Sequence, residues 1–102
     1  MEKITGECVC PGKARGKIIN YKAKLIFNNT DIVIIENWLP QIIFTAKSAG
    51  ALICSHGSIT SHASIVAREL NIPSLVKVQN LNLLKDGDVV TVDALEETIQ
   101  II

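Results

Sequence analysis

The segment ALICSHGSITSHASIVARELNIP, residues 51–73, consists of a short apolar run, a loop of small polar residues and an apolar pattern at helical spacing. Residues 51–54 predict a buried strand, and residues 60–70 predict an amphipathic helix. Residues 71–73, Asn-Ile-Pro, provide the signals that end a helix. The segment therefore predicts a strand and a helix joined by a loop that precedes the first helical turn.

His62 stands in the first turn of this predicted helix. The first backbone N–H groups of a helix have no partner within it, and the positive end of the helix dipole lies beside them, so this end attracts anions. A phosphoryl group on the imidazole would lie near these donors. Neutral imidazole is also a nucleophile. The position therefore suits a histidine that takes a phosphoryl group from one donor and passes it to one acceptor.

Small and hydroxylated residues flank His62. Gly57 allows a tight turn before the helix. Thr60, Ser61 and Ser64 supply hydroxyls that are able to bond the imidazole or a phosphoryl oxygen. The loop is therefore polar, whereas the helix that follows is anchored by apolar residues.

The rest of the chain favours strands. Sixteen Ile and eight Val among 102 residues are β-branched, which favours a sheet over a helix bundle. Residues 5–9 and 17–21 read as a hairpin across Pro11-Gly12, and residues 31–35 read as a central strand. Residues 39–49 predict a helix with a left-handed stop at Gly50. The C-terminal part predicts a turn at residues 85–88 and strands near residues 90–93 and 98–102.

Composition limits the function. The chain is 48% hydrophobic and has ten basic and ten acidic residues, which describes one domain, residues 1–102, without net charge. Such a chain lacks the cation excess that nucleic-acid binding needs. No apolar stretch is long enough for a membrane helix, and charged residues occupy the first positions, where a signal peptide would be apolar. We therefore expect a cytoplasmic protein with no nucleic-acid or membrane partner.

The segment GSITSHASIVARELNIP, residues 57–73, resembles the motif G-G-x-T-S-H-A-A-I-V-A-R-E-L-G-I-P. This is the phosphorylation motif of the phosphohistidine, or swivelling, domain of the phosphoenolpyruvate-utilising enzymes. Pyruvate phosphate dikinase, phosphoenolpyruvate synthase and enzyme I of the sugar phosphotransferase system are members of that family. The resemblance extends over essentially the whole chain.

The resemblance implies an α/β fold, a three-layer β/β/α swivelling domain, with His62 as the phosphorylated residue. Thr60 is then its hydrogen-bonding companion. The residues expected to bind the phosphate are Gly57, Ser58, Ser61, Ala63 and Ser64. The domain would relay a phosphoryl group between a donor site, which uses phosphoenolpyruvate or ATP, and an acceptor.

The resemblance also implies partners, because the chain has no G-x-x-x-x-G-K-[ST] phosphate loop and no room for a barrel. It is therefore not expected to be a complete enzyme alone. We expect nucleotide-binding domains, phosphoenolpyruvate-binding barrel domains, or both, as partners. The domain is expected to bind no cofactor, since Mg²⁺ would be held at the partner sites.

Four positions depart from the family pattern. Ser58 replaces the second motif glycine and is harmless only if its φ is negative. Asn71 replaces the glycine at the helix end and tolerates the left-handed conformation. Lys77 and Ala94 stand where relatives have glycine in turns.

Two alternative functions remain open. The first is an unphosphorylated regulatory or docking module of a larger phosphotransferase. The second is a metal site made of Cys54, His56 and His62 with Cys8 or Cys10, although the spacing fits no familiar zinc motif. We expect the cysteines to be unpaired, with Cys54 and one of the other two as small buried residues.

Three further side chains have more general expectations. His56 is expected to be a solvated turn residue. Arg68 lies about 240° around the helix from His62 and is expected to form surface or interdomain ion pairs. Trp38 and Phe44 are core or docking residues.

Overall fold

The computed structural model describes residues 4–23 and 26–102. Its strands are β1 (Ile4–Cys10), β2 (Lys13–Asn20), β3 (Asp31–Ile34), β4 (Ala51–Ile53), β5 (Ser74–Gln79), β6 (Val89–Asp93) and β7 (Thr98–Ile101). The helices are α1 (Pro40–Thr45) and α2 (His62–Glu69), with 3-10 turns η1 (Tyr21–Ala23) and η2 (Leu81–Leu83). None of the described helices is long and apolar enough to cross a membrane.

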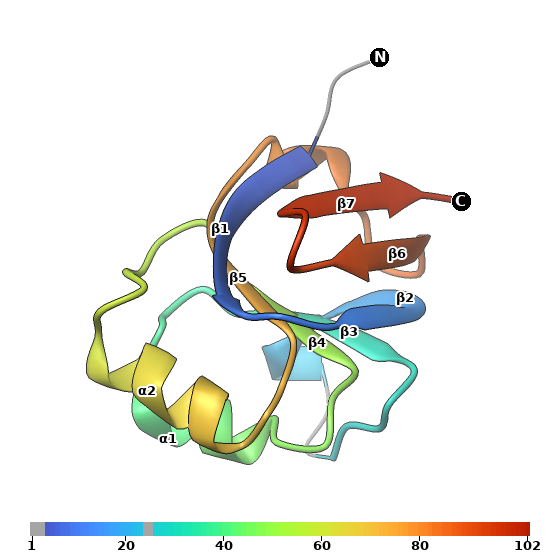
Figure 1. The fold of residues 1–102 in the computed structure, drawn as a ribbon. Coiled ribbons are helices and arrows are strands. Elements are labelled where there is room, and N and C mark those ends of the chain that lie inside the picture. The colour runs from blue at the N-terminus through green and yellow to red at the C-terminus, as the bar shows by residue number, and fades with distance from the viewer. Residues whose placement is uncertain (1–3, 24–25) are drawn as a thin grey trace.

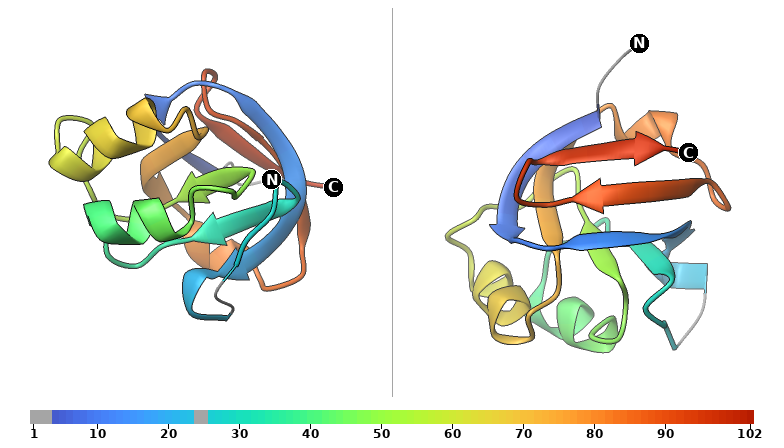
Figure 2. Two further views of the ribbon diagram at one scale, coloured as in Figure 1. Left: turned by 90° about the horizontal axis from the view of Figure 1, so that it is seen from below. Right: turned by 45° about the vertical axis from the view of Figure 1, so that its right-hand side comes forward.

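The strands form one closed barrel in the order β1-β5-β4-β3-β2-β6-β7. Strands β2, β3, β4 and β5 run parallel, and the remaining pairs are antiparallel. The two helices lie side by side on one side of the barrel, whereas the β6–β7 hairpin lies on the other (Figure 1). Figure 2 shows the same arrangement from two further sides. The mixed sheet with few helices confirms the α/β class, and the three-layer description stays a prediction.

The central parallel strands β3 and β4 are buried on both faces, which explains their nearly continuous apolar sequences. Ile32 and Ile53 point into a cluster inside the barrel, and their neighbours Val33 and Leu52 point into a second cluster under the helices. Trp38 was expected to be a core or a docking residue, and the structure places it in this second cluster with 8% exposure. Because successive side chains of a strand alternate between faces, three or four residues per strand supply both cores.

The hairpin predicted across Pro11-Gly12 is wrong. Strand β1 pairs with β5 and β7, whereas β2 pairs with β3 and β6. Gly12 has a φ of 148°, and its carbonyl accepts a hydrogen bond from Ala94. The turn is thus a corner of the barrel, at which β1 ends and β2 begins beside different partners. Strands distant in sequence determine this pairing.

Both helices are shorter than their sequence patterns. Helix α1 begins at Pro40, as predicted, but ends at Thr45, and Gly50 is not the left-handed stop. Gly50 is needed for space, since a Cβ atom there would lie 2.4 Å from the carbonyl oxygen of Asn29. The positive φ expected at Asn71, beyond α2, is confirmed at 57°.

The positions that depart from the family glycines differ in their backbone conformation. Ser58 does not have a positive φ, so its side chain causes no backbone strain. Lys77 has a positive φ of 52°, and it lies at a register shift between β1 and β5. Beyond Asp93 the left-handed residue is Glu97, at 61°, and Ala94 needs no glycine conformation.

We expect Lys77→Gly to raise the free energy of unfolding by about 0.5–1 kcal/mol. A left-handed backbone costs an L-residue roughly 1–2 kcal/mol, and glycine removes this cost. Glycine also loses more chain entropy on folding, which offsets about 0.5–1 kcal/mol of the gain. Urea unfolding measures the change. The matched control, Lys17→Gly in β2, replaces an exposed lysine without a positive φ and is expected to destabilise. An equal loss of unfolding free energy in both variants would contradict the prediction.

Candidate functional site

His62 is the first residue of α2, and its side chain is exposed. Ser61 is the N-cap, and its hydroxyl accepts the Ser64 N–H at 3.3 Å. The N–H groups of His62 and Ala63 have no acceptor among the described residues. The imidazole likewise makes no hydrogen bond or ion pair with any residue of 4–23 or 26–102. An accessible ring therefore stands beside open backbone donors, as the sequence predicted.

The backbone carbonyl of Ser58 holds the loop before α2 in place. It accepts hydrogen bonds from the Ser61 N–H at 3.1 Å, from the Ser61 hydroxyl at 2.9 Å and from the Ser64 hydroxyl. Three donors on one oxygen fix the loop against the first turn of the helix. Ser61 and Ser64 thus use their hydroxyl protons inside the loop.

Ser64 and Ala63 lie beneath the site. Both are buried, with Ser64 0% and Ala63 2% exposed. The Ser64 hydroxyl also accepts the Trp38 Nε1–H at 2.9 Å. Ser64 therefore supports the loop from the core, and Ala63 can offer an incoming anion only its backbone N–H.

The Thr60 hydroxyl is bonded to Ser58 and not to the imidazole. Its Oγ1 lies 2.9 Å from the Ser58 Oγ, which also accepts the Thr60 N–H at 3.2 Å. The structure thus brings Thr60 into the same loop as His62, two residues away. The companion role of Thr60 and the phosphate-binding roles of Gly57, Ser58, Ser61, Ala63 and Ser64 stay predictions.

Gly57 packs directly against the indole of Trp38. Its φ is 96°, and a Cβ atom there would lie 3.0 Å from both Cδ1 and Cγ of the indole. The turn therefore requires glycine for its conformation and for the close approach. The loop thus packs on the Trp38 indole at Gly57, and the indole N–H also donates to the Ser64 hydroxyl.

Arg68 connects the loop to the barrel, a role that the sequence analysis missed. Its Nε donates to the Val9 carbonyl of β1 at 3.0 Å, and its guanidinium donates to the Ile59 carbonyl in the loop. The expected ion pairs of Arg68 within the described chain are therefore replaced by backbone contacts. The angle between Arg68 and His62 around the helix places the two residues on different faces. It could not show that the long Arg68 side chain reaches back to the loop.

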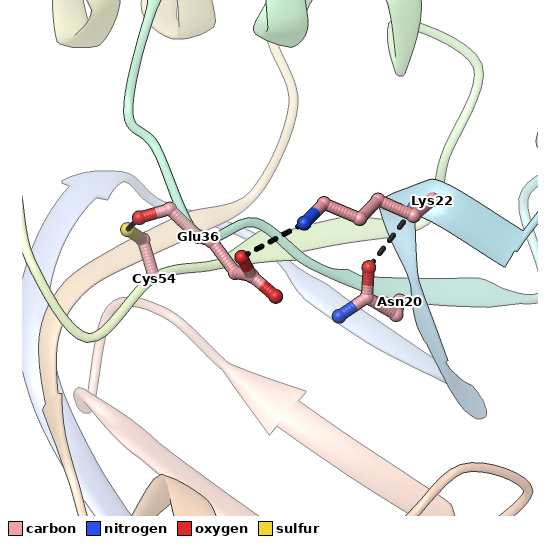
Figure 3. A network of polar contacts seen from close by, with 4 residues as sticks. All are labelled: Asn20, Lys22, Glu36 and Cys54. Atoms are coloured by element: carbon pink, nitrogen blue, oxygen red, sulfur yellow. Dashed lines mark hydrogen bonds and ion pairs between the residues drawn. The ribbon is translucent and has the colours of Figure 1, made fainter.

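A second network lies where β2, β3 and β4 end (Figure 3). The Lys22 ammonium binds the Glu36 carboxylate at 3.2 Å, and the Lys22 N–H donates to Asn20 at 2.9 Å. The hydrogen bond from Lys22 holds the pKa of Glu36 below its ordinary value. The Glu36 carbonyl lies 3.9 Å from the Cys54 thiol, which in turn receives the His56 N–H at 3.4 Å. The network therefore ties the start of the loop to the neighbouring strand ends.

The described residues contain no group of three His, Cys, Asp or Glu side chains placed to hold a metal ion. Cys54 is 0% and Cys10 is 4% exposed, which confirms them as small buried residues, and all three cysteines are free. His56 is exposed, as expected for a turn residue. Phe44 is 54% exposed and lies outside the core.

A cavity of about 490 Å³ lies on β2, β6 and β7 and does not include the predicted site. It is lined by Lys13, Ala14, Arg15, Thr91, Val92, Asp93, Glu96, Thr98 and Gln100. His62 itself stands on an open surface.

Known proteins resemble this chain in fold and in sequence. The family model of the PEP-utilising enzyme mobile domain matches residues 27–97. The chain is 37% identical over 99 residues to a probable phosphoenolpyruvate synthase of Archaeoglobus fulgidus, covering 88% of this chain and 12% of the relative. A solution structure of Enzyme I is 34% identical over 70% of this chain and 30% of that one, with a TM-score of 0.58. Aconitase X of Thermococcus kodakaraensis has a TM-score of 0.72 at 20% identity, covering 100% of this chain and 99% of that one, and this likeness concerns the fold alone.

The family model of the mobile domain thus covers most of the barrel, including the helix whose N-terminus carries the exposed histidine. The chain belongs to the mobile-domain family of the PEP-utilising enzymes. It spans about an eighth of the length of the phosphoenolpyruvate synthase that it matches.

We expect Gly57→Ala to destabilise the protein more than Gly87→Ala. Both glycines have a positive φ, 96° and 92°, but a Cβ at Gly87 has no atom within 4 Å. The added pressure on Trp38 makes the Gly57 variant less stable by about 1 kcal/mol beyond the control, as overpacking does. Unfolding curves compare the two, and equal losses would contradict the packing argument.

The Cys54 thiol is expected to be unreactive in the folded protein. Burial raises its pKa above the ordinary value, against the smaller opposing effect of the His56 amide, and thiolate is the reactive form. At pH 8 wild type and Cys54→Ala should release equal amounts of thionitrobenzoate from a disulfide reagent while folded. In denaturant the wild type should release one equivalent more. A difference of one equivalent in the folded proteins would contradict the prediction.

Proposed function

We propose that the domain accepts a phosphoryl group on His62 and relays it between a donor site and an acceptor on partner domains or proteins. The single observation that supports this role is the exposed imidazole beside the unbonded N–H groups of His62 and Ala63. The family membership supports the same chemistry. The donor is phosphoenolpyruvate or ATP, and the whole protein is a phosphotransferase of the phosphoenolpyruvate synthase or pyruvate phosphate dikinase type.

The transfer follows from the position of the ring. A lone pair on one ring nitrogen attacks the phosphorus atom while the bond from phosphorus to the donor oxygen breaks, and that oxygen leaves with the bonding electrons. The other ring nitrogen keeps its proton. The negative charge of the bound phosphoryl group then lies at the positive end of α2, where the open N–H groups stabilise it. The reverse displacement, by an acceptor oxygen, restores the free imidazole.

The residue types around His62 do not favour a resident Mg²⁺ ion. Residues 57–64 offer hydroxyls and amides but no carboxylate, the side chain that this ion prefers in proteins. We therefore assign Mg²⁺ to the partner sites and to the phosphate substrates, where it would neutralise developing charge. Nucleotide-binding and phosphoenolpyruvate-binding barrel domains are the proposed partners.

Two finer expectations accompany the relay. We propose that the barrel and the helix pair correspond to the β/β/α layers of a swivelling domain. In that description the helix layer carries His62 outward to the partners. We also propose a cytoplasmic location, which the sequence predicted.

Phosphorylation of His62 can be tested with labelled donor and candidate partner domains. The wild-type domain should acquire a label that is acid-labile and alkali-stable, as a phosphoramidate bond is. His62→Ala should abolish it, and the change should leave folding intact because the side chain is exposed. His56→Ala, the matched control in the same loop, should keep the label. Label that persists in His62→Ala would overturn the proposal.

The regulatory alternative makes the opposite prediction for the same assay. A docking module would bind a partner phosphotransferase and change its rate without acquiring label. Binding without labelling, unchanged in His62→Ala, would therefore favour that role.

A further inference from the structure

The hydroxyls of Ser58 and Thr60 form a hydrogen-bonded pair in the loop that precedes His62. Ser58 stands at the second glycine of the family motif, so glycine relatives have no hydroxyl at this position. The two oxygens are 2.9 Å apart, and the Ser58 Oγ also accepts the Thr60 N–H at 3.2 Å. Ser58 is half-buried, whereas Thr60 is exposed.

Either hydroxyl of this pair could be the donor, and the acceptors available to Ser58 favour Ser58. The Ser58 Oγ receives the Thr60 N–H, and its own proton still needs an acceptor. The Thr60 Oγ1 is the acceptor that the described residues offer it. With Ser58 donating, the Thr60 proton is free to point outward from the loop. A hydroxyl that accepts one hydrogen bond is also a stronger donor of the next.

We propose that Ser58 is a positioning residue that directs the Thr60 hydroxyl toward the phosphoryl oxygens on His62, and not toward the imidazole. This inference rests on the proposed function. The chain of bonds runs from the Thr60 N–H through the Ser58 and Thr60 hydroxyls to the phosphoryl group. It stabilises the charged phosphohistidine, because it acts on the phosphoryl group and not on the ring.

The test uses chemical phosphorylation, which needs no partner. Potassium phosphoramidate transfers a phosphoryl group to histidine, releasing ammonia, and ³¹P NMR follows the hydrolysis of the product. The chain has two histidines, so every variant carries His56→Ala to leave His62 as the only site. The variants are Ser58→Ala, Thr60→Val, the double variant, and Ser58→Thr, which restores a hydroxyl. Ser55→Ala is the matched control, because Ser55 is exposed in the same loop without a hydrogen bond to a described residue.

We expect Ser58→Ala and Thr60→Val each to hydrolyse phospho-His62 about 3- to 10-fold faster, the loss typical of one intramolecular hydrogen bond. The double variant should be no faster than the faster single variant, because both changes break one chain of bonds. Ser58→Thr should restore most of the slow rate, and Ser55→Ala should match the parent.

Two results would overturn the inference. The first is a Ser58→Ala rate equal to the parent, or effects of the two single variants that multiply in the double variant. The second is a shift in the pKa of unphosphorylated His62 upon Ser58→Ala, measured by NMR titration, since that would place the Thr60 hydroxyl on the ring. Absence of partner labelling would refute the proposed function and would leave this chemical measurement unaffected.

Discussion

The backbone carbonyl of Ser58 is the point on which the site depends. It accepts three donors from Ser61 and Ser64, and Ser64 is bonded in turn to the buried indole of Trp38. Each such bond contributes on the order of 1 kcal/mol net, and leaving one of these buried groups unpaired costs about 1–3 kcal/mol. The loop is therefore held in one conformation by the core beneath it. Only a loop fixed in this way can keep the first amides of α2 open beside an exposed ring.

The barrel places this loop where it can be reached. The parallel strands β2 to β5 all end at one edge, and the loops that follow them converge there, which is where parallel sheets commonly bind ligands. The Lys22–Glu36 pair and the Cys54 thiol join neighbouring strand ends at this edge. Arg68 links the loop to β1 as well. The loop that carries the histidine is thus tied to the barrel at several points.

The sequence predicted the local elements better than the connections between strands. The small residues and hydroxyls before an apolar helical pattern indicated the helix N-terminus, and His62 lies in its first turn. The β-branched runs predicted the strands. The pairing of β1 was mispredicted, because the contacts that select β5 and β7 join residues far apart in the chain. The role of Arg68 was also missed, since nothing in its local pattern shows that its side chain reaches Val9 and Ile59.

The sequence by itself determined that strands and two helices would form, and that an imidazole would stand at the start of the second helix. Local propensity and the spacing of apolar residues are sufficient for that, because they act within one turn or one strand. Only the tertiary structure decided that Ser64 is buried under Trp38, that the Thr60 hydroxyl pairs with Ser58, and that Lys77 adopts a left-handed backbone. These features depend on which groups meet across the barrel, and burial then requires each polar group to find its partner there.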